Sequence, residues 1–208
     1  MNLANRLTLT RLALVPFFLI FTIQDNVNTR IAALVFFLLG SLTDFFDGYV
    51  ARKQKAVTVL GTFLDPLVDK LFISAAFISF VQLQEIYVPA WMVVFIIGRE
   101  FLITGLRTLA ASQGRILGAE TIGKFKTTWQ IITVITILVV LITNSVLESR
   151  WGISKEDLLQ SPEDMKRMAG RILDTLPYCL CFLTTVLTIV SGYAYLKKHK
   201  DLFLCAKY

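Results

Sequence analysis

Apolar residues fill six long stretches of this chain, and shorter polar stretches separate them. The apolar stretches cover residues 6–23, 30–51, 60–83, 88–111, 129–147 and 176–196. The last two are the cleanest examples of the roughly 20 mainly apolar residues that a helix needs to cross a bilayer; charged residues or proline interrupt the other four. Because lipid offers the backbone no hydrogen-bond partners, we expect all six to be transmembrane helices.

Composition supports a single membrane domain over residues 1–208. Of the residues, 55% are hydrophobic and 17% are charged, and the mean hydropathy is +0.66. The first apolar stretch leads into no small-residue cleavage site, so a signal peptide is not expected. The net charge of +6 suits an anionic membrane surface or anionic substrates. The basic residues are scattered between apolar stretches, so we do not expect a nucleic-acid partner.

The distribution of basic residues predicts the orientation. An even number of spans places both termini on one side, and that side carries thirteen basic residues against six on the other. This bias puts both termini in the cytoplasm. The segment of about 148–175 reads as a polar insert on the far side, with a short helix and a helix cap in 161–164. Residues 1–9 either lie along the cytoplasmic interface or form the frayed start of the first helix.

Cysteine and histidine offer little catalytic chemistry. Cys179, Cys181 and Cys205 lack the spacing of a zinc site, and we interpret them as ordinary small apolar residues. The only histidine, His199, lies in the basic C-terminal tail. Imidazole is therefore not the expected general base.

Four aspartates at the junction of the second and third stretches are the informative feature. Asp44 and Asp47 share one helix face, and Asp65 and Asp69 share another. The connection between the two stretches is short, so antiparallel helices would bring the pairs together near their cytoplasmic ends. Each carboxylate in a membrane segment costs at least about 2.5 kcal/mol. Four carboxylates in one cavity would repel unless protonated or bound to cations, and their hard oxygens favour Mg²⁺, Mn²⁺ or Ca²⁺ over Zn²⁺.

Small and basic residues surround these aspartates. Gly48, Ala51 and Gly61 leave room for close approach of a helix or ligand, and Arg52 stands where its guanidinium can hold a phosphate. The structural alternative is that the aspartates are packing or ion-pair residues, with Lys70 as a partner of Asp69. Four aspartates with these neighbours are harder to explain in that way.

Together these positions resemble the signature of the CDP-alcohol phosphatidyltransferase family. The match is Asp44-x2-Asp47-Gly48-x2-Ala51-Arg52-x8-Gly61-x3-Asp65-x3-Asp69, and every position is filled with the family's spacing. Shorter segments are similar to the bacterial phosphatidylglycerophosphate synthases of that family. They are Asn5-x-Leu7-Thr8-x2-Arg11, Arg99-Glu100, Leu106-Arg107 and Gly123-Lys124-x-Lys126-Thr127.

The resemblance implies a six-helix membrane enzyme, a homodimer in a bacterial cytoplasmic membrane with a cytoplasmic active site. The implied reaction is CDP-diacylglycerol plus glycerol 3-phosphate giving phosphatidylglycerol phosphate and CMP. Two divalent cations, Mg²⁺ or Mn²⁺, would be held by Asp44, Asp47, Asp65 and Asp69. Asp69 would also be the base, while Asp47, Gly48, Ala51, Arg52 and Gly61 would bind the CDP-lipid.

A separate anion site is expected for the acceptor. Arg107, Lys124 and Lys126 fall near the cytoplasmic ends of the fourth and fifth spans, where they could bind the phosphate of glycerol 3-phosphate. Lys124 and Lys126 cannot share one face of a regular helix, so a loop or helix start is expected there. The alternative is that all three merely follow the positive-inside rule. For Arg99 and Glu100, a structural ion pair is favoured over substrate contact.

Three other functions stay open. A relative of the same family would make cardiolipin, phosphatidylserine or an inositol lipid. A cation channel or transporter could use the aspartates as its ion path, although it would not need the glycine, alanine and arginine placements. A catalytically silent scaffold is disfavoured by the complete set of aspartates.

Overall fold

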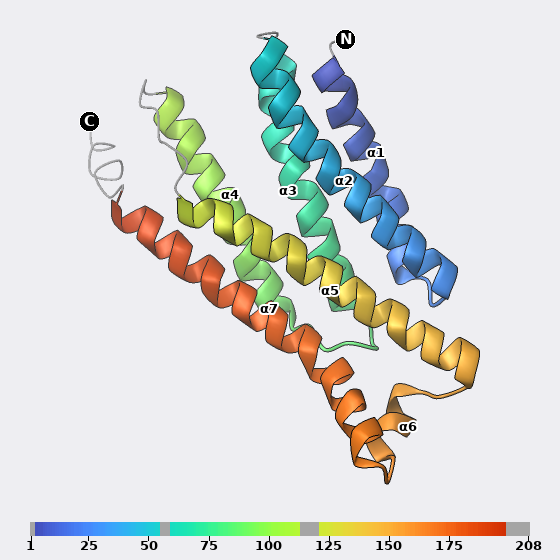
Figure 1. Cartoon of the computed structure of the whole chain (residues 1–208). Coiled ribbons are helices and arrows are strands. Elements are labelled where there is room, and N and C mark those ends of the chain that lie inside the picture. The colour runs from blue at the N-terminus through green and yellow to red at the C-terminus, as the bar shows by residue number, and fades with distance from the viewer. Residues whose placement is uncertain (1–2, 55–58, 113–120, 199–208) are drawn as a thin grey trace.

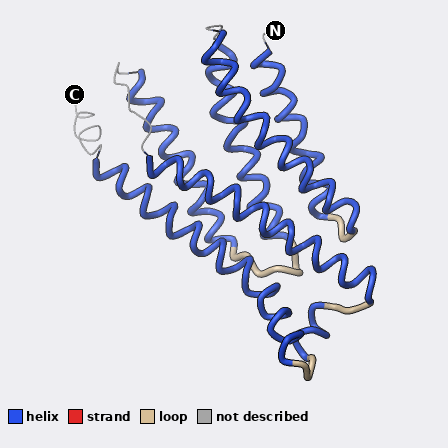
Figure 2. The backbone as a smooth tube through the Cα atoms, viewed as in Figure 1, coloured by secondary structure: helices blue, strands red, loops and turns tan. Residues whose placement is uncertain are grey.

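The computed structural model describes the backbone of residues 3–54, 59–112 and 121–198. Side chains are described in the same ranges, except at residues 3–8, 44–54, 59–67, 69, 112 and 121–124. All regular secondary structure in this part of the chain is helical, which confirms the all-α prediction (Figure 2).

Helices account for each predicted apolar stretch and for part of the insert. They are α1 (Leu3–Ile23), α2 (Val27–Gln54), α3 (Val59–Gln82), α4 (Ala90–Ser112), α5 (Thr121–Trp151), α6 (Lys155–Gln160) and α7 (Asp164–Lys198). Among the described residues, two segments are long and apolar enough to cross a membrane by themselves, Phe125–Trp151 and Asp164–Lys198. The N-terminal stretch continues into α1 without a break from Leu3 onward.

The long helices form a bundle in which helices that follow each other in the chain run in opposite directions (Figure 1). Helix α1 packs on both α2 and α3, α5 joins α2 to α7, and α4 packs on α7. Six helix termini lie at one end of the bundle. They are the start of α1, the end of α2, the start of α3, the end of α4, the start of α5 and the end of α7. We call this end the signature end, because it includes the predicted aspartate positions.

Three phenylalanines join α1, α2 and α3 in the core. Phe18, Phe37 and Phe72 are buried, and their ring centroids lie 5.6–5.9 Å apart. Aromatic rings at this spacing pack favourably beyond the area they bury. Gly40 lies directly against Phe72: a Cβ added there would be 2.7 Å from the ring carbon Cζ. Only a residue without a side chain permits this separation of α2 and α3.

Polar side chains fill the contact between α5 and α7. The hydroxyls of Thr133 and Thr184 lie 2.9 Å apart and are buried. Gln130 and Thr188, one turn away on the same two helices, are also buried. A buried polar pair is favourable only in the register that satisfies it, so Thr133 and Thr184 help to specify how α5 and α7 align.

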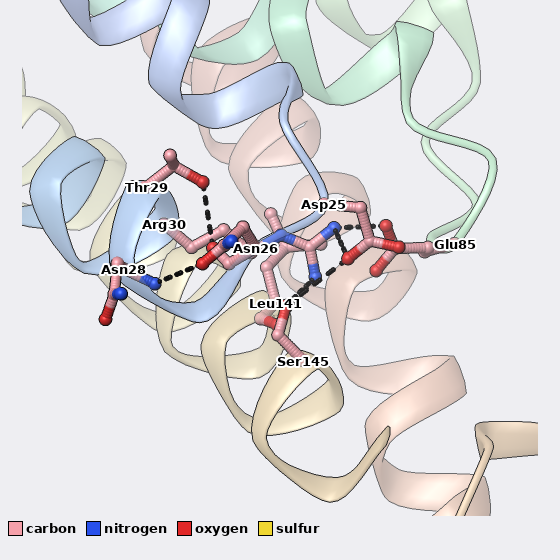
Figure 3. Close-up of polar contacts among 8 residues, drawn as sticks. All are labelled: Asp25, Asn26, Asn28, Thr29, Arg30, Glu85, Leu141 and Ser145. Atoms are coloured by element: carbon pink, nitrogen blue, oxygen red, sulfur yellow. Dashed lines mark hydrogen bonds and ion pairs between the residues drawn. The ribbon is translucent and has the colours of Figure 1, made fainter. Parts of the chain in front are cut away.

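Arg30 fastens the opposite end of the bundle (Figure 3). Its side chain is 1% exposed and donates to the Leu141 carbonyl oxygen at 2.9 Å and to the Ser145 hydroxyl. It also forms ion pairs with Asp25, at 3.1 Å, and with Glu85. One guanidinium therefore joins the α1–α2 turn, α2, the α3–α4 connection and α5, which its five N–H donors make possible.

The polar insert is more helical than its sequence predicted. Helix α5 extends to Trp151 and α7 begins at Asp164, so little of the insert is loop. A short helix, α6, is present, and a capping box between Ser154 and Asp157 begins it. The predicted cap in 161–164 instead lies where α7 begins. Lys155 holds α6 to the bundle, since its Nζ donates to the Glu85 carbonyl oxygen at 2.9 Å and to Asp174 at 2.7 Å.

Candidate active site

The signature positions lie on the two helices predicted to carry them. Asp44, Asp47, Gly48, Ala51 and Arg52 are in α2, at its C-terminal part. Gly61, Asp65 and Asp69 are in α3, in its first turns. The side chains of these residues lie outside the described part of the structure, so their coordination by metal and their catalytic roles stay predictions.

The described contacts bring these two helix segments close together. Gly40 lies one turn before Asp44 on α2, and Phe72 lies one turn after Asp69 on α3. The Phe72 ring packs against Gly40 and stacks on Phe37. Residues 55–58 make the short connection from α2 to α3. The backbones that carry the two aspartate pairs are thus held near each other by this packing.

A largely buried group of charges lies between the middle of α4 and the first turns of α5. Lys126 is 2% exposed and forms an ion pair with Glu100. The Arg99 Nη1 atom lies 3.5 Å from the Glu100 Oε1 atom, so the ion pair predicted within α4 is present. Lys126 extends this pair to α5. Gly192 of α7 lies against Arg99: a Cβ there would be 3.0 Å from the Arg99 Cγ atom. The group therefore depends on three helices for its position.

The other predicted acceptor residues fall nearby in the fold. Arg107, one of the last residues of α4, places its guanidinium 5.4 Å from the centre of the Tyr195 ring on α7. This cation–π geometry restricts the arginine side chain without neutralising its charge. Lys124 is in the first turns of α5, and its side chain lies outside the described residues. Helix α5 begins at Thr121, so both lysines are at a helix start, one of the two arrangements predicted.

The predicted metal site depends on the four signature aspartates. Among the side chains that the structure describes, no three His, Cys, Asp or Glu residues form a group that could hold a metal ion. The signature aspartates lie outside that set. Their donor chemistry, carboxylate oxygens without imidazole or thiolate, fits a hard divalent cation.

A hollow at the other end of the bundle is a different feature. Its volume is about 910 Å³, and it lies between the start of α2 and the end of α5. The lining residues include Asp25, Asn28, Glu148 and Arg150. It is close to Arg30 and remote along α2 from Asp44 and Asp47, so it does not belong to the predicted site.

Three contacts in this part of the molecule were not predicted from the sequence. Gly40 and Phe72 looked like ordinary residues of apolar stretches, and their contact depends on the packing of two helices. The burial of Lys126 against Glu100 was missed because the residues are on different helices. Gly192 gave a weak signal, as a glycine within an otherwise regular apolar helix, and such glycines often mark a close packing contact.

Comparison with known proteins gives a consistent result. The family model described as CDP-alcohol phosphatidyltransferase matches residues 1–154. The chain is 44% identical over 149 residues to a CDP-diacylglycerol–glycerol-3-phosphate 3-phosphatidyltransferase of Bacillus subtilis, covering 66% of this chain and 76% of that protein. Proteins with the same name from Rickettsia bellii and Rickettsia typhi are 30% and 32% identical, over 97% of this chain and 97% and 99% of theirs.

Proposed function

We infer that this chain, which belongs to the CDP-alcohol phosphatidyltransferase family, transfers the phosphatidyl group of CDP-diacylglycerol to glycerol 3-phosphate, giving phosphatidylglycerol phosphate and CMP. The observation that carries this is the complete aspartate signature on two helices held together by the Gly40–Phe72 contact. The names of the relatives, which specify glycerol 3-phosphate, support the choice of acceptor.

Two divalent cations, Mg²⁺ or Mn²⁺, are the cofactors we propose. Asp44, Asp47, Asp65 and Asp69 would hold them, because four carboxylates in one cavity need about that much positive charge. When bound, the cations would supply charge stabilisation at the pyrophosphate of CDP-diacylglycerol. The donor set fits this cofactor, and the family is one in which metal dependence is typical.

The chain's own residues would perform the remaining steps. Asp69 would accept the proton of the attacking hydroxyl of glycerol 3-phosphate, since a carboxylate can act as base in a chain with no well-placed histidine. Gly48, Ala51 and Gly61 would leave room for the cytidine nucleotide. Arg52 would bind its phosphates, as guanidinium groups commonly do.

The phosphate of the acceptor, glycerol 3-phosphate, would be bound by Arg107, Lys124 and Lys126. Glu100 competes for Lys126 in the structure, so a phosphate that approached Lys126 would share it with a carboxylate. Arg107 keeps its charge over the Tyr195 ring and is therefore the better candidate for direct phosphate contact.

The proposed setting is a bacterial cytoplasmic membrane crossed by six helices, α1 to α5 and α7, with both termini and the signature end in the cytoplasm. The bias of basic residues toward that end supports this orientation. A homodimer is also proposed, and the exposed apolar residues of α4, such as Val94 and Phe95, offer a surface for it.

The test is incorporation of radiolabelled glycerol 3-phosphate by the purified protein in detergent, with CDP-diacylglycerol as donor. Asp65→Asn and Asp69→Asn should each abolish transfer while the protein still inserts, and chelation of divalent cations should do the same to the unaltered protein. Asp164→Asn is the matched control, because Asp164 is 90% exposed and lies outside the signature. Full activity of either signature variant would disprove the metal hypothesis. Offering several alcohols in one reaction shows which of them accepts the phosphatidyl group, and so separates this function from that of a relative with another acceptor.

A further inference from the structure

Helix α7 carries an exposed apolar stripe along its whole length. Met165, Met168 and Ile172, in its first turns, are 84%, 64% and 48% exposed. Exposed residues recur every seven positions on the same side, at Met165, Ile172, Cys179, Val186 and Tyr193. A seven-residue step rotates the position by only about 20° on a straight helix. The first turns therefore continue, with a gradual rotation, the surface that later turns present to their surroundings.

The helix is too long for this stripe to lie entirely within the hydrocarbon core. Its 35 residues extend roughly 50 Å, whereas the core is about 30 Å thick. Lys197 and Lys198 end the helix, and basic residues at that position belong at the cytoplasmic surface. About 20 residues before them, near Pro177, the helix reaches the opposite surface. Met165, Met168 and Ile172 lie beyond that point.

The opposite side of the same turns is packed against protein. Gly170 is buried against α6, where an added Cβ would lie 3.0 Å from the Leu158 Cβ atom. The Lys155–Asp174 ion pair closes this contact. In an α-helix Gly170 points nearly opposite to Met168 and Ile172. Helix α6 thus covers one side of α7 and leaves the methionine side uncovered.

We propose that α6 and the first turns of α7, residues 155–175, form a hairpin on the membrane surface opposite the signature end. The side of the hairpin formed by Met165, Met168 and Ile172 would insert among the phospholipid headgroups and upper acyl chains. This inference rests on the membrane orientation given under the proposed function. Phospholipid is the occupant because the stripe is continuous with the exposed apolar side of the same helix that would lie in the bilayer in that orientation.

Two further features fit a bilayer surface. Trp151, at the end of α5, is 66% exposed, and tryptophan is enriched where membranes meet water. Arg171 is exposed and adjoins Ile172, so its long side chain can reach headgroup phosphates while its methylene groups stay in the apolar layer. Pro177 lies inside α7, and a proline there permits the bend that would lay the first turns along the surface.

Spin-label accessibility in proteoliposomes tests the hairpin. Single cysteines are introduced at Met165, Met168, Arg167 and Val186, in a variant whose native cysteines are replaced by alanine, and each is nitroxide-labelled. Collision with oxygen, which concentrates in lipid, is compared with collision with a water-soluble nickel chelate. We expect labels at Met165 and Met168 to favour oxygen severalfold over the chelate, as at Val186. The label at Arg167 should favour the chelate.

Two results would overturn the proposal. Chelate access at Met168 equal to that at Arg167 would place the hairpin in water, and exclusion of both reagents would mean that protein covers the stripe, as in a second copy. Transfer activity and the Val186 label are read in the same vesicles, so a failed hairpin is separable from a wrong membrane orientation or function. If the cysteine-free protein does not fold, a tryptophan is introduced by Met168→Trp in Trp91→Phe, Trp129→Phe, Trp151→Phe protein, and its quenching by brominated lipid is measured; an unquenched tryptophan at position 168 overturns the proposal.

Discussion

Replacing Gly40 with alanine tests whether the contact between α2 and α3 sets the geometry of the aspartate pairs. The new Cβ would lie 2.7, 2.9 and 3.0 Å from three carbons of the Phe72 ring. Ordinary carbon–carbon contacts lie at about 3.5–4.0 Å, so the two helices must separate by roughly 1 Å. The ring cannot move aside, because Phe18 and Phe37 pack against it with centroids 5.6 and 5.7 Å away.

Two consequences follow from that separation. Extra volume in a packed core typically costs about 1–3 kcal/mol, so the thermal unfolding midpoint in detergent should fall. A displacement of about 1 Å at reacting groups can reduce the rate about 100-fold. We therefore expect Gly40→Ala to lower the turnover number by one to two orders of magnitude, measured as CMP release at saturating substrates. Asp44 and Asp47 themselves are unchanged in this variant.

Controls come from within the chain. Gly98 and Gly105 of α4 have no atom within 4 Å of an added Cβ. Alanine there should leave activity unchanged and raise stability slightly, because glycine weakens a helix by about 0.5–1 kcal/mol. Combining Gly40→Ala with Phe72→Leu should recover part of the lost activity. Wild-type turnover and stability in Gly40→Ala, or no recovery in the double variant, would refute the reasoning.

Three further predictions concern other parts of the molecule. Gly192→Ala should displace Arg99 and raise the KM for glycerol 3-phosphate severalfold with little change for CDP-diacylglycerol, measured by initial rates; equal effects on both would argue against a positioning role. Arg30→Met should lower the free energy of unfolding by about 1–3 kcal/mol, because it removes charge-assisted hydrogen bonds from a buried site, and an unchanged thermal midpoint would contradict this. A hydrogen bond from the Ser154 backbone, and a second one from its side chain, lower the pKa of Asp157 below its ordinary value of 3.8. The capping box should therefore stabilise α6 fully above pH 3.8, and this stabilisation should be lost as the pH falls through the lowered pKa. Hydrogen exchange of α6 amides should detect that loss, and Asp157→Asn should abolish its pH dependence.

The sequence predicted the long helices well and their ends less well. Hydropathy identifies the part of a helix that lies in lipid, but a helix continues into polar residues as long as its backbone is hydrogen-bonded. Thus α5 begins at Thr121 rather than near residue 129, and α7 begins at Asp164 rather than near 176. The polar insert is helical for the same reason, since its charged residues are compatible with exposed helix faces.

The candidate site was predictable to the extent that it is local in sequence. Spacing alone placed the aspartates on two helix faces, because helical periodicity is fixed. The contacts that hold those helices are between distant residues, such as Gly40 with Phe72, and no spacing rule reports them. The Lys126–Glu100 ion pair likewise depends on how α4 and α5 pack.

The position of Arg30 has a mechanical consequence for the aspartates at the other end of α2. Arg30 and Asp47 are about 25 Å apart along α2 at 1.5 Å per residue. Ion pairs to Asp25 and Glu85 hold the Arg30 end of the helix. From that lever length, a tilt of only roughly 2° about this end would move the backbone at Asp47 by about 1 Å. The packing around Arg30 therefore affects the placement of aspartates that lie far from it.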